Sequence, residues 1–176
     1  MSRLISLSIK STALLCLGLA LASGGVFAPR KAAAQDLQAS IVGLWKVTSH
    51  ANKIPATGAL EHPFGEHPHS YQLFTRGGRM LNVILGENRK RPAGTIPTDA
   101  ERAALFNTLV AQIATYKTDG NKLLVHYEAA ESPSADGTDR TYTAEVSGNK
   151  LTLTAMPFTS SQGQQVISIR TFERAE

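Results

Sequence analysis

The chain is nearly free of cysteine, since its 176 residues contain only one, Cys16. Cys16 lies in an N-terminal stretch that we expect to be removed, and the remaining chain would then have neither a disulfide bond nor a thiol nucleophile. The stability of the folded part must therefore come from its core. Leu15 precedes Cys16 at a position where a lipoprotein signal has a small residue, so a lipid anchor is not expected.

Excess positive charge is also missing once the same stretch is set aside. The whole chain has 18 Lys and Arg against 14 Asp and Glu, a net charge of +4. Four of the basic residues and none of the acidic ones lie in positions 1–34, which leaves 14 of each sign. The one local basic cluster, Arg89-Lys90-Arg91, is interpreted as solvated loop surface. We therefore expect no nucleic-acid partner.

The sequence lacks the patterns of a membrane span and of the common catalytic motifs. The apolar run over residues 13–22 is shorter than the roughly 20 residues that a transmembrane helix needs, so no integral membrane span is expected. There is no Ser-His-Asp order, no pair of carboxylates at catalytic spacing and no glycine loop for phosphate. No cofactor is expected, and whether the protein is an enzyme stays open.

The N-terminus itself is typical of an export signal. Arg3 and Lys10 lie at the start, and Ala32-Ala33-Ala34 places small residues where a signal peptidase reads them. We predict a signal peptide over residues 1–34, with cleavage before Gln35. No Arg-Arg pair precedes the apolar run, so the chain is expected to cross the membrane unfolded.

The alternative cleavage point, after Ala28, would leave Pro29 directly behind the cut. With cleavage before Gln35, residues 35–176 form a periplasmic or secreted domain. About 140 residues suit one domain with one core, and no internal repeat, long linker or low-complexity tract interrupts them.

Segments with strand character dominate this domain. Short turn signals separate them, among them Gly77-Gly78, Asp119-Gly120 and Gly148-Asn149, which accept the positive φ of tight hairpins. A small up-and-down barrel needs about eight strands. The sequence therefore predicts an all-β fold, a closed eight-stranded antiparallel barrel with strands over residues 41–49, 70–74, 80–85, 113–117, 122–130, 140–146, 150–155 and 165–173.

One segment has helical periodicity instead. Thr98 and Glu101 form a capping box, and apolar residues recur at steps of three and four from Ala103 to Ile113. The pattern predicts an amphipathic helix of about 14 residues. Its apolar stripe would be buried against an open end of the barrel, which the helix would cover as a plug or a lid.

The single tryptophan, Trp45, lies on the first predicted strand, and Arg174 lies at the end of the last. These two strands are neighbours in a closed barrel. The Arg174 guanidinium is then expected across the Trp45 ring, a cation-π contact that contributes about 0.5 to 2 kcal/mol. The alternative is an ordinary core tryptophan and a solvated terminal arginine.

Five motifs, in order along residues 40–175, resemble those of the bacterial lipocalin-like domain family. They are Gly43-Leu44-Trp45, similar to G-x-W; residues 71–80, similar to Y-x-x-F-T-x-x-G-R-M; residues 116–120, similar to Y-x-x-D-G; Val125-His126-Tyr127-Glu128 with Gly137 and Arg140; and the closing Phe172-Glu173-Arg174. The resemblance implies a calycin-type barrel whose interior holds a small, largely apolar molecule. It does not imply a reaction.

The resemblance and the alternation of side chains disagree about which residue faces the interior. On residues 122–130 the face that carries Tyr127 is more apolar than the face that carries His126, so alternation places Tyr127 inside. The family, which often has paired histidines here, implies that His126 points inward toward Arg140 and Tyr142. The two interpretations exclude each other within one register.

The candidate ligand-binding residues are Tyr71, Tyr116, His126, Tyr127, Arg140 and Tyr142. A tyrosine inside a barrel supplies apolar area and one hydroxyl that can orient a ligand. The alternative for each tyrosine is simple filling of a strand surface. A buried tyrosine beside Arg140 is expected to have a lowered pKa and could act as an acid or a base.

Three of the five histidines, His62, His67 and His69, lie within eight positions. From an extended backbone His67 and His69 would point the same way, as a zinc or copper site requires. Prolines and a glycine between them indicate a loop, however. We interpret the segment as a polar loop at the barrel mouth and predict no metal site.

Three functional hypotheses follow. The first is an exported lipocalin-like protein that binds a small hydrophobic or amphipathic molecule. The second is a lyase, isomerase, cyclase or hydrolase of a small organic substrate on the same barrel, using His126 or a tyrosine with Arg140. The third is a structural envelope protein whose barrel is filled. An open interior lined by these residues would favour the first two.

Overall fold

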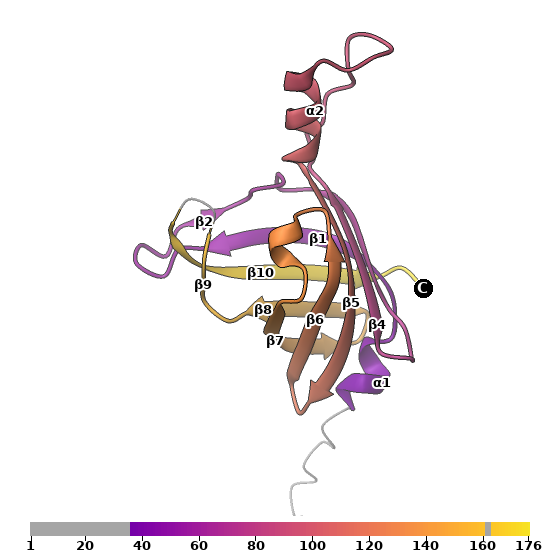
Figure 1. The fold of residues 1–176 in the computed structure, drawn as a ribbon. Helices are drawn as coiled ribbons and strands as arrows, with labels where there is room; N and C mark the ends of the chain where they lie inside the picture. The colour runs from indigo at the N-terminus through magenta and orange to yellow at the C-terminus, as the bar shows by residue number, and fades with distance from the viewer. Residues whose placement is uncertain (1–35, 161–162) are drawn as a thin grey trace, which may run out of the picture. The chain divides into compact units, whose positions relative to one another are not determined.

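The computed structural model describes residues 36–160 and 163–176, which form a closed antiparallel barrel (Figure 1). The predicted signal peptide lies outside these residues. The eight barrel strands follow one another around the sheet in sequence order, and the first also pairs with the last. They are β1 (Gly43–Lys53), β3 (His69–Phe74), β4 (Arg79–Leu85), β5 (Leu109–Asp119), β6 (Lys122–Ala130), β7 (Asp139–Ser147), β8 (Lys150–Ala155) and β10 (Gln165–Arg174). The predicted eight-stranded barrel is confirmed.

Shorter elements complete the described chain. Two-residue strands add to the ends of β1 and β10, and they are β2 (Leu60–Glu61) and β9 (Phe158–Thr159). The helices are α1 (Leu37–Ile41), α2 (Asp99–Phe106) and the 3-10 turn η1 (Pro133–Ala135). Within residues 36–160 and 163–176, no helix combines the length and the apolar character that crossing a membrane requires.

The closure of the barrel places the predicted pair in contact. Trp45 lies opposite Arg174 in the β1–β10 ladder, and the Arg174 Cζ lies 4.1 Å from the Trp45 ring centroid. Arg174 also donates hydrogen bonds to the carbonyl oxygens of Val42 (2.8 Å) and Ser40 (2.6 Å). The Trp45 indole donates to the carbonyl of Ile41 at 2.7 Å. The two side chains therefore bind the segment before β1 as well as each other.

Gly43, the first residue of the Gly-x-Trp motif, is required by this close packing. Its φ is +134°, a conformation that residues with a side chain rarely adopt. A Cβ at this position would lie 2.6 Å from Nη1 of Arg174 and 2.8 Å from the carbonyl oxygen of Glu176. The absence of a side chain lets the end of the chain lie directly on the start of β1.

One end of the barrel interior is packed solid. α1 lies at this end (Figure 1) and buries Leu37 and Ile41 in the main apolar core. The inward-facing positions of the strands here are apolar, because alternate residues of each strand point to the same face. They include Trp45, Val47, Phe74, Met80, Leu123, Val125, Leu151, Leu153 and Phe172.

The predicted helix is shorter than expected and does not bury an apolar stripe. α2 begins with the predicted capping box at Thr98 and Glu101, but it ends at Phe106, which is 52% exposed. No residue of α2 is buried. The second half of the predicted stripe belongs to β5, where Leu109 pairs with Leu85 of β4. Pairing with a neighbouring strand thus overrides the local helical periodicity, and the helix that closes a barrel end is α1.

Candidate ligand-binding site

Away from α1, the inward-facing positions become polar and a cavity of about 760 Å³ opens. On β10, Phe172 in the core is followed by Arg170 and Ser168, and on β4, Met80 is followed by Asn82. This volume lies within the range of roughly 300 to 1,000 Å³ that is typical of small-molecule sites. The barrel therefore has a filled apolar end and an open end whose wall is half polar.

Arg170 is the charged group buried in this wall. It is 5% exposed, and its Cζ lies 5.0 Å from the centroid of the Tyr142 ring. Its Nη1 donates a long hydrogen bond, 3.4 Å, to Oε1 of Gln72. Gln72 in turn donates to the sulfur of Met80 at 3.1 Å. The chain of contacts joins the guanidinium to the top of the apolar core.

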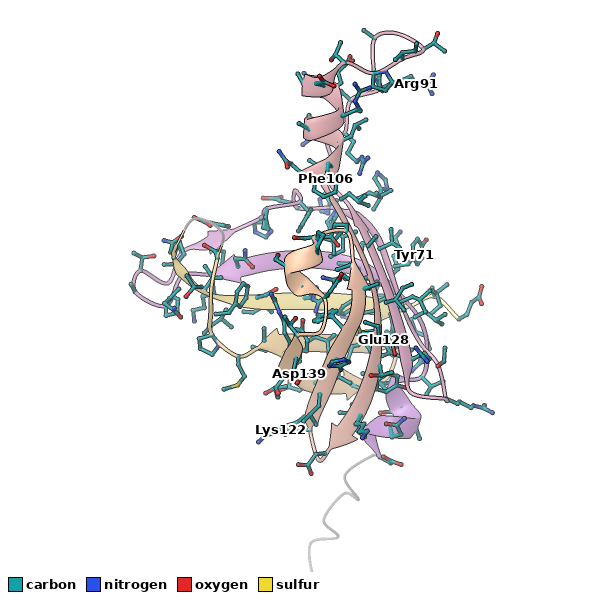
Figure 2. The ribbon with its side chains drawn as sticks, viewed as in Figure 1. Tyr71, Arg91, Phe106, Lys122, Glu128 and Asp139 are labelled. Carbon is teal, nitrogen blue, oxygen red and sulfur yellow. The ribbon has the colours of Figure 1, made fainter. Side chains whose placement is uncertain are left out.

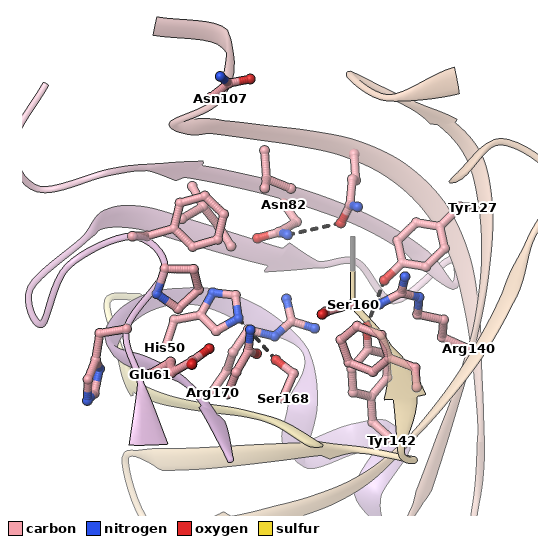
Figure 3. A pocket seen from close by; sticks show the side chains of 18 of the residues that line it. His50, Glu61, Asn82, Asn107, Tyr127, Arg140, Tyr142, Ser160, Ser168 and Arg170 are labelled. Atoms are coloured by element: carbon pink, nitrogen blue, oxygen red, sulfur yellow. Dashed lines mark hydrogen bonds between the residues drawn. The ribbon is translucent and has the colours of Figure 1, made fainter. Parts of the chain in front are cut away.

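Two tyrosine hydroxyls meet in the cavity wall beside Arg170. Tyr127 and Tyr142 are both buried, and their hydroxyl oxygens lie 2.8 Å apart (Figure 3). Burial raises the pKa of Tyr127, and the neighbouring Tyr142 raises it further, against the smaller opposing effect of Arg170 and Arg140. The expectation of a lowered tyrosine pKa is therefore wrong for Tyr127. The Tyr127 phenol is a neutral hydrogen-bonding group at physiological pH.

His50 is a cavity residue that the sequence did not single out. Its Nε2 lies 3.0 Å from Oγ of Ser168, and its ring stacks on Phe64 with a centroid separation of 5.2 Å. Burial lowers the pKa of His50 to about 3, with smaller contributions from the charges of Arg170 and His62. The imidazole is accordingly neutral at pH 7.

Four buried polar atoms have no hydrogen-bond partner among the described residues. They are Nδ1 of His50, Nδ1 of His62, Oδ1 of Asn52 and Oδ1 of Asn82. All four residues line the cavity. An unsatisfied buried polar group costs about 1 to 3 kcal/mol, and such groups are rare in folded proteins. Their concentration at one place indicates a surface that is made to contact a polar group.

Three of the six predicted ligand-binding residues line the cavity together. Tyr127 and Tyr142 form the buried pair, and Arg140 is an exposed residue at the rim. The Cζ of Arg140 lies 4.8 Å from the ring centroid of Phe158 in β9. The structure thus brings together residues of β6 and β7 that the sequence analysis proposed.

The other three lie elsewhere. Tyr71 is 49% exposed on the outer wall (Figure 2), because its neighbours Ser70 and Gln72 occupy the inward positions of β3. Tyr116 is part of the apolar core and donates to the carbonyl of Thr75 at 2.7 Å. Neither tyrosine lines the cavity, because the register of β3 turns Tyr71 outward and Tyr116 lies within the apolar core.

His126 points outward, and its Nδ1 lies 2.7 Å from Oδ1 of Asp139 (labelled in Figure 2). Its side chain is 51% exposed, whereas Tyr127 is 2% exposed. The interpretation from strand alternation is therefore confirmed, and the one that turned His126 inward is wrong. The reason is that Tyr127 shares its face with the core residues Leu123 and Val125.

The three histidines of the 62–69 segment are not brought together as ligands. His62 lines the cavity, while His67 and His69 are exposed. Among residues 36–160 and 163–176, no three His, Cys, Asp or Glu side chains are close enough to hold a metal ion.

Strict alternation along β1 from the inward-facing Trp45 and Val47 would turn His50 outward, so the sequence did not indicate it. A β-bulge between Val47 and Ser49 shifts the register against β10, so that His50 and Asn52 face inward in place of their neighbours. Arg170 could have been found, because it shares its parity on the last predicted strand with the core residue Phe172.

A closed antiparallel barrel with an internal cavity at one end is the architecture of the small-molecule-binding barrels. Residues 42–175 match the lipocalin-like domain family, and the chain belongs to this family. No curated protein is significantly similar to it. Membership of this family and the barrel fold are both consistent with the binding of a small molecule.

Proposed function

We propose that the protein is exported and binds a small amphipathic molecule in the barrel cavity. The observation that carries the proposal is the gathering of all four unpartnered buried polar atoms in one cavity of about 760 Å³. Apolar side chains, among them Ile84, Val110 and Phe158, line the same space. A ligand with both polar and apolar parts fits such a wall better than a wholly apolar one.

The two other hypotheses have less support. A structural protein with a filled barrel would need no polar cavity. For acid-base catalysis, the two buried groups Tyr127 and His50 are poorly matched to neutral pH, since the pKa of Tyr127 is raised and that of His50 is lowered to about 3. Binding is therefore the function that these residues favour.

Binding can be tested with the protein purified from its native host. After denaturation and extraction, mass spectrometry is expected to identify a small molecule in stoichiometric amount, and the purified molecule should bind again to the refolded protein. Tyr127→Phe is expected to weaken this binding by about 2- to 10-fold through the loss of one hydroxyl. Tyr71→Phe makes the same change on the outer wall and should have no effect.

Three outcomes would contradict the proposal or redirect it. If the purified protein yields no bound molecule and no metabolite from an extract of the host cells binds to it, the carrier function is wrong. If the two variants weaken binding equally, the ligand does not occupy this cavity. If the molecule is converted into a product by the wild type but not by Tyr127→Phe, the protein is an enzyme.

Export is a separate prediction. The mature protein is expected to begin at or near Gln35, because Ala32-Ala33-Ala34 offers the small residues that signal peptidase requires. Intact-mass measurement of the protein recovered from the periplasm or the medium checks this. A mass that retains residues 1–28 would show that no signal peptide is removed.

A further inference from the structure

We propose that the molecule bound in this cavity carries an anionic group, a carboxylate or an oxyanion of similar size, and that Arg170 binds it. This inference rests on the proposed binding function and names the chemical class of the ligand. It is carried by the surroundings of the Arg170 guanidinium and by the hydroxyl donor that the neighbouring Tyr127–Tyr142 pair offers.

Arg170 is a buried charge for which the chain provides no carboxylate partner. All 14 acidic residues of the sequence lie among the described residues, and none forms an ion pair with it. The acidic residue that lines the cavity, Glu61, is exposed. Removing a charge from water without a partner is costly. The folded protein without ligand therefore carries the desolvation cost of the Arg170 guanidinium, and an anion that enters the cavity would offset it.

Most of the hydrogen-bonding capacity of Arg170 is also unused by the described residues. A guanidinium has five N–H donors, and one of them reaches Oε1 of Gln72 at 3.4 Å. The Tyr142 ring lies against the guanidinium and helps to orient it, and Arg170 extends into the cavity between His50 and Tyr142 (Figure 3). An oriented planar fork with free donors matches the two oxygens of a carboxylate.

The tyrosine pair adds a further donor. The two hydroxyls of Tyr127 and Tyr142 share one hydrogen bond, so one of the two protons remains without an acceptor among the described residues. Burial raises the pKa of Tyr127, which favours its protonated phenol, and the hydroxyl proton that the pair does not use is available to an anion. The neutral His50 contributes no charge to the cavity. Arg170 is therefore the buried charge beside the tyrosine pair.

The unpartnered side-chain carbonyl oxygens of Asn52 and Asn82 need hydrogen-bond donors from the ligand. They accept hydrogen bonds, and the amide nitrogen of Asn82 is already used, since it donates to Oε1 of Gln112 at 3.2 Å. The same molecule is therefore expected to carry a hydroxyl or an N–H group in addition to its anion.

A pair of fluorescent probes that differ by one anionic group tests the assignment. 8-Anilino-1-naphthalenesulfonate is anionic, and N-phenyl-1-naphthylamine is its neutral counterpart. Both are titrated into the wild type and into Arg170→Met, Arg170→Lys and Arg140→Met. Arg170→Met is expected to weaken the sulfonate by about 10- to 100-fold, the loss of a charge-assisted contact, and to change the affinity of the neutral probe by less than about 3-fold.

The other variants serve as controls. Arg170→Lys keeps the charge and should retain part of the sulfonate affinity, whereas Arg140→Met removes a charge at the exposed rim and should have a much smaller effect. Thermal unfolding shows that each variant is folded, and Arg170→Met is expected to raise the midpoint because it removes an unpartnered buried charge.

The outcomes distinguish a failure of the anionic assignment from a failure of the binding function. Suppose that the neutral probe binds the wild type. If Arg170→Met then lowers the affinity for both probes equally, or changes the affinity for neither, the anionic assignment is wrong while the binding function stands. If neither probe binds the folded wild type, or if the affinity of both is unchanged by Tyr127→Trp, which narrows the cavity, the proposed function itself fails.

Discussion

Trp45→Ala is expected to lower the free energy of unfolding by about 3 to 5 kcal/mol, the loss that follows truncation of a large core aromatic. Trp45 has no exposed surface, and it contacts Arg174 where the first and last strands of the barrel pair. The substitution removes the packing at this closure together with the indole hydrogen bond to Ile41. Denaturant unfolding of the mature protein measures the change.

The contact between Trp45 and Arg174 also predicts how the two substitutions combine. Arg174→Ala should cost about 2 kcal/mol, because it removes the cation-π contact and two hydrogen bonds to backbone carbonyls. The double variant should lose about 1 kcal/mol less than the sum of the single losses. Additive effects would mean that the two side chains do not stabilise each other. Arg79→Ala, at an exposed ion pair with Glu128, is the control and should cost less than about 1 kcal/mol.

Acidification is expected to destabilise the protein through His50. Its pKa is about 3 in the folded chain against the ordinary histidine value of 6.5, so between these values the unfolded chain binds more protons. The stability that comes from the neutral imidazole is complete above pH 6.5 and is lost as the pH falls toward 3. The slope approaches about 1.4 kcal/mol per pH unit, or about 2 to 3 kcal/mol between pH 6.5 and 4.5.

His50→Gln isolates this contribution, because the carboxylates of the chain titrate in both proteins. The difference in unfolding free energy between wild type and variant should shrink or reverse in favour of the variant as the pH is lowered from 7 to 4.5. His69→Gln removes an exposed histidine and serves as the control. A difference that does not depend on pH would show that His50 is not buried in its neutral form.

Much of the fold could be predicted from short-range patterns. The alternation on residues 122–130 placed Tyr127 inside and His126 outside, as the structure does, although the family resemblance implied the reverse. The hairpin at Gly148-Asn149 and the meeting of Trp45 with Arg174 were also predicted, since a closed barrel requires its first and last strands to pair. These features depend on local sequence or on closure alone.

The predictions that failed depended on contacts between distant segments. The apolar stripe that ended at Ile113 was read as helix, but pairing with β4 makes its second half a strand. Tyr71 was proposed for the interior, yet the register of β3 gives the inner positions to Ser70 and Gln72. A shift of one residue exchanges the two faces of a strand, and nothing within the segment itself fixes that choice.

The sequence by itself determined that this chain forms an antiparallel barrel, where most of its strands lie and which residues close it, because strand periodicity, turn residues and the end motifs are local signals. The tertiary structure alone decided which polar residues share the cavity. His50 reaches it through a β-bulge, and Arg170 and Asn82 come from strands far apart in the chain. The depth of a side chain within a barrel is set by the stagger of neighbouring strands, which is a long-range property. It is this stagger that leaves Arg170 buried at the boundary between the apolar core and the open end.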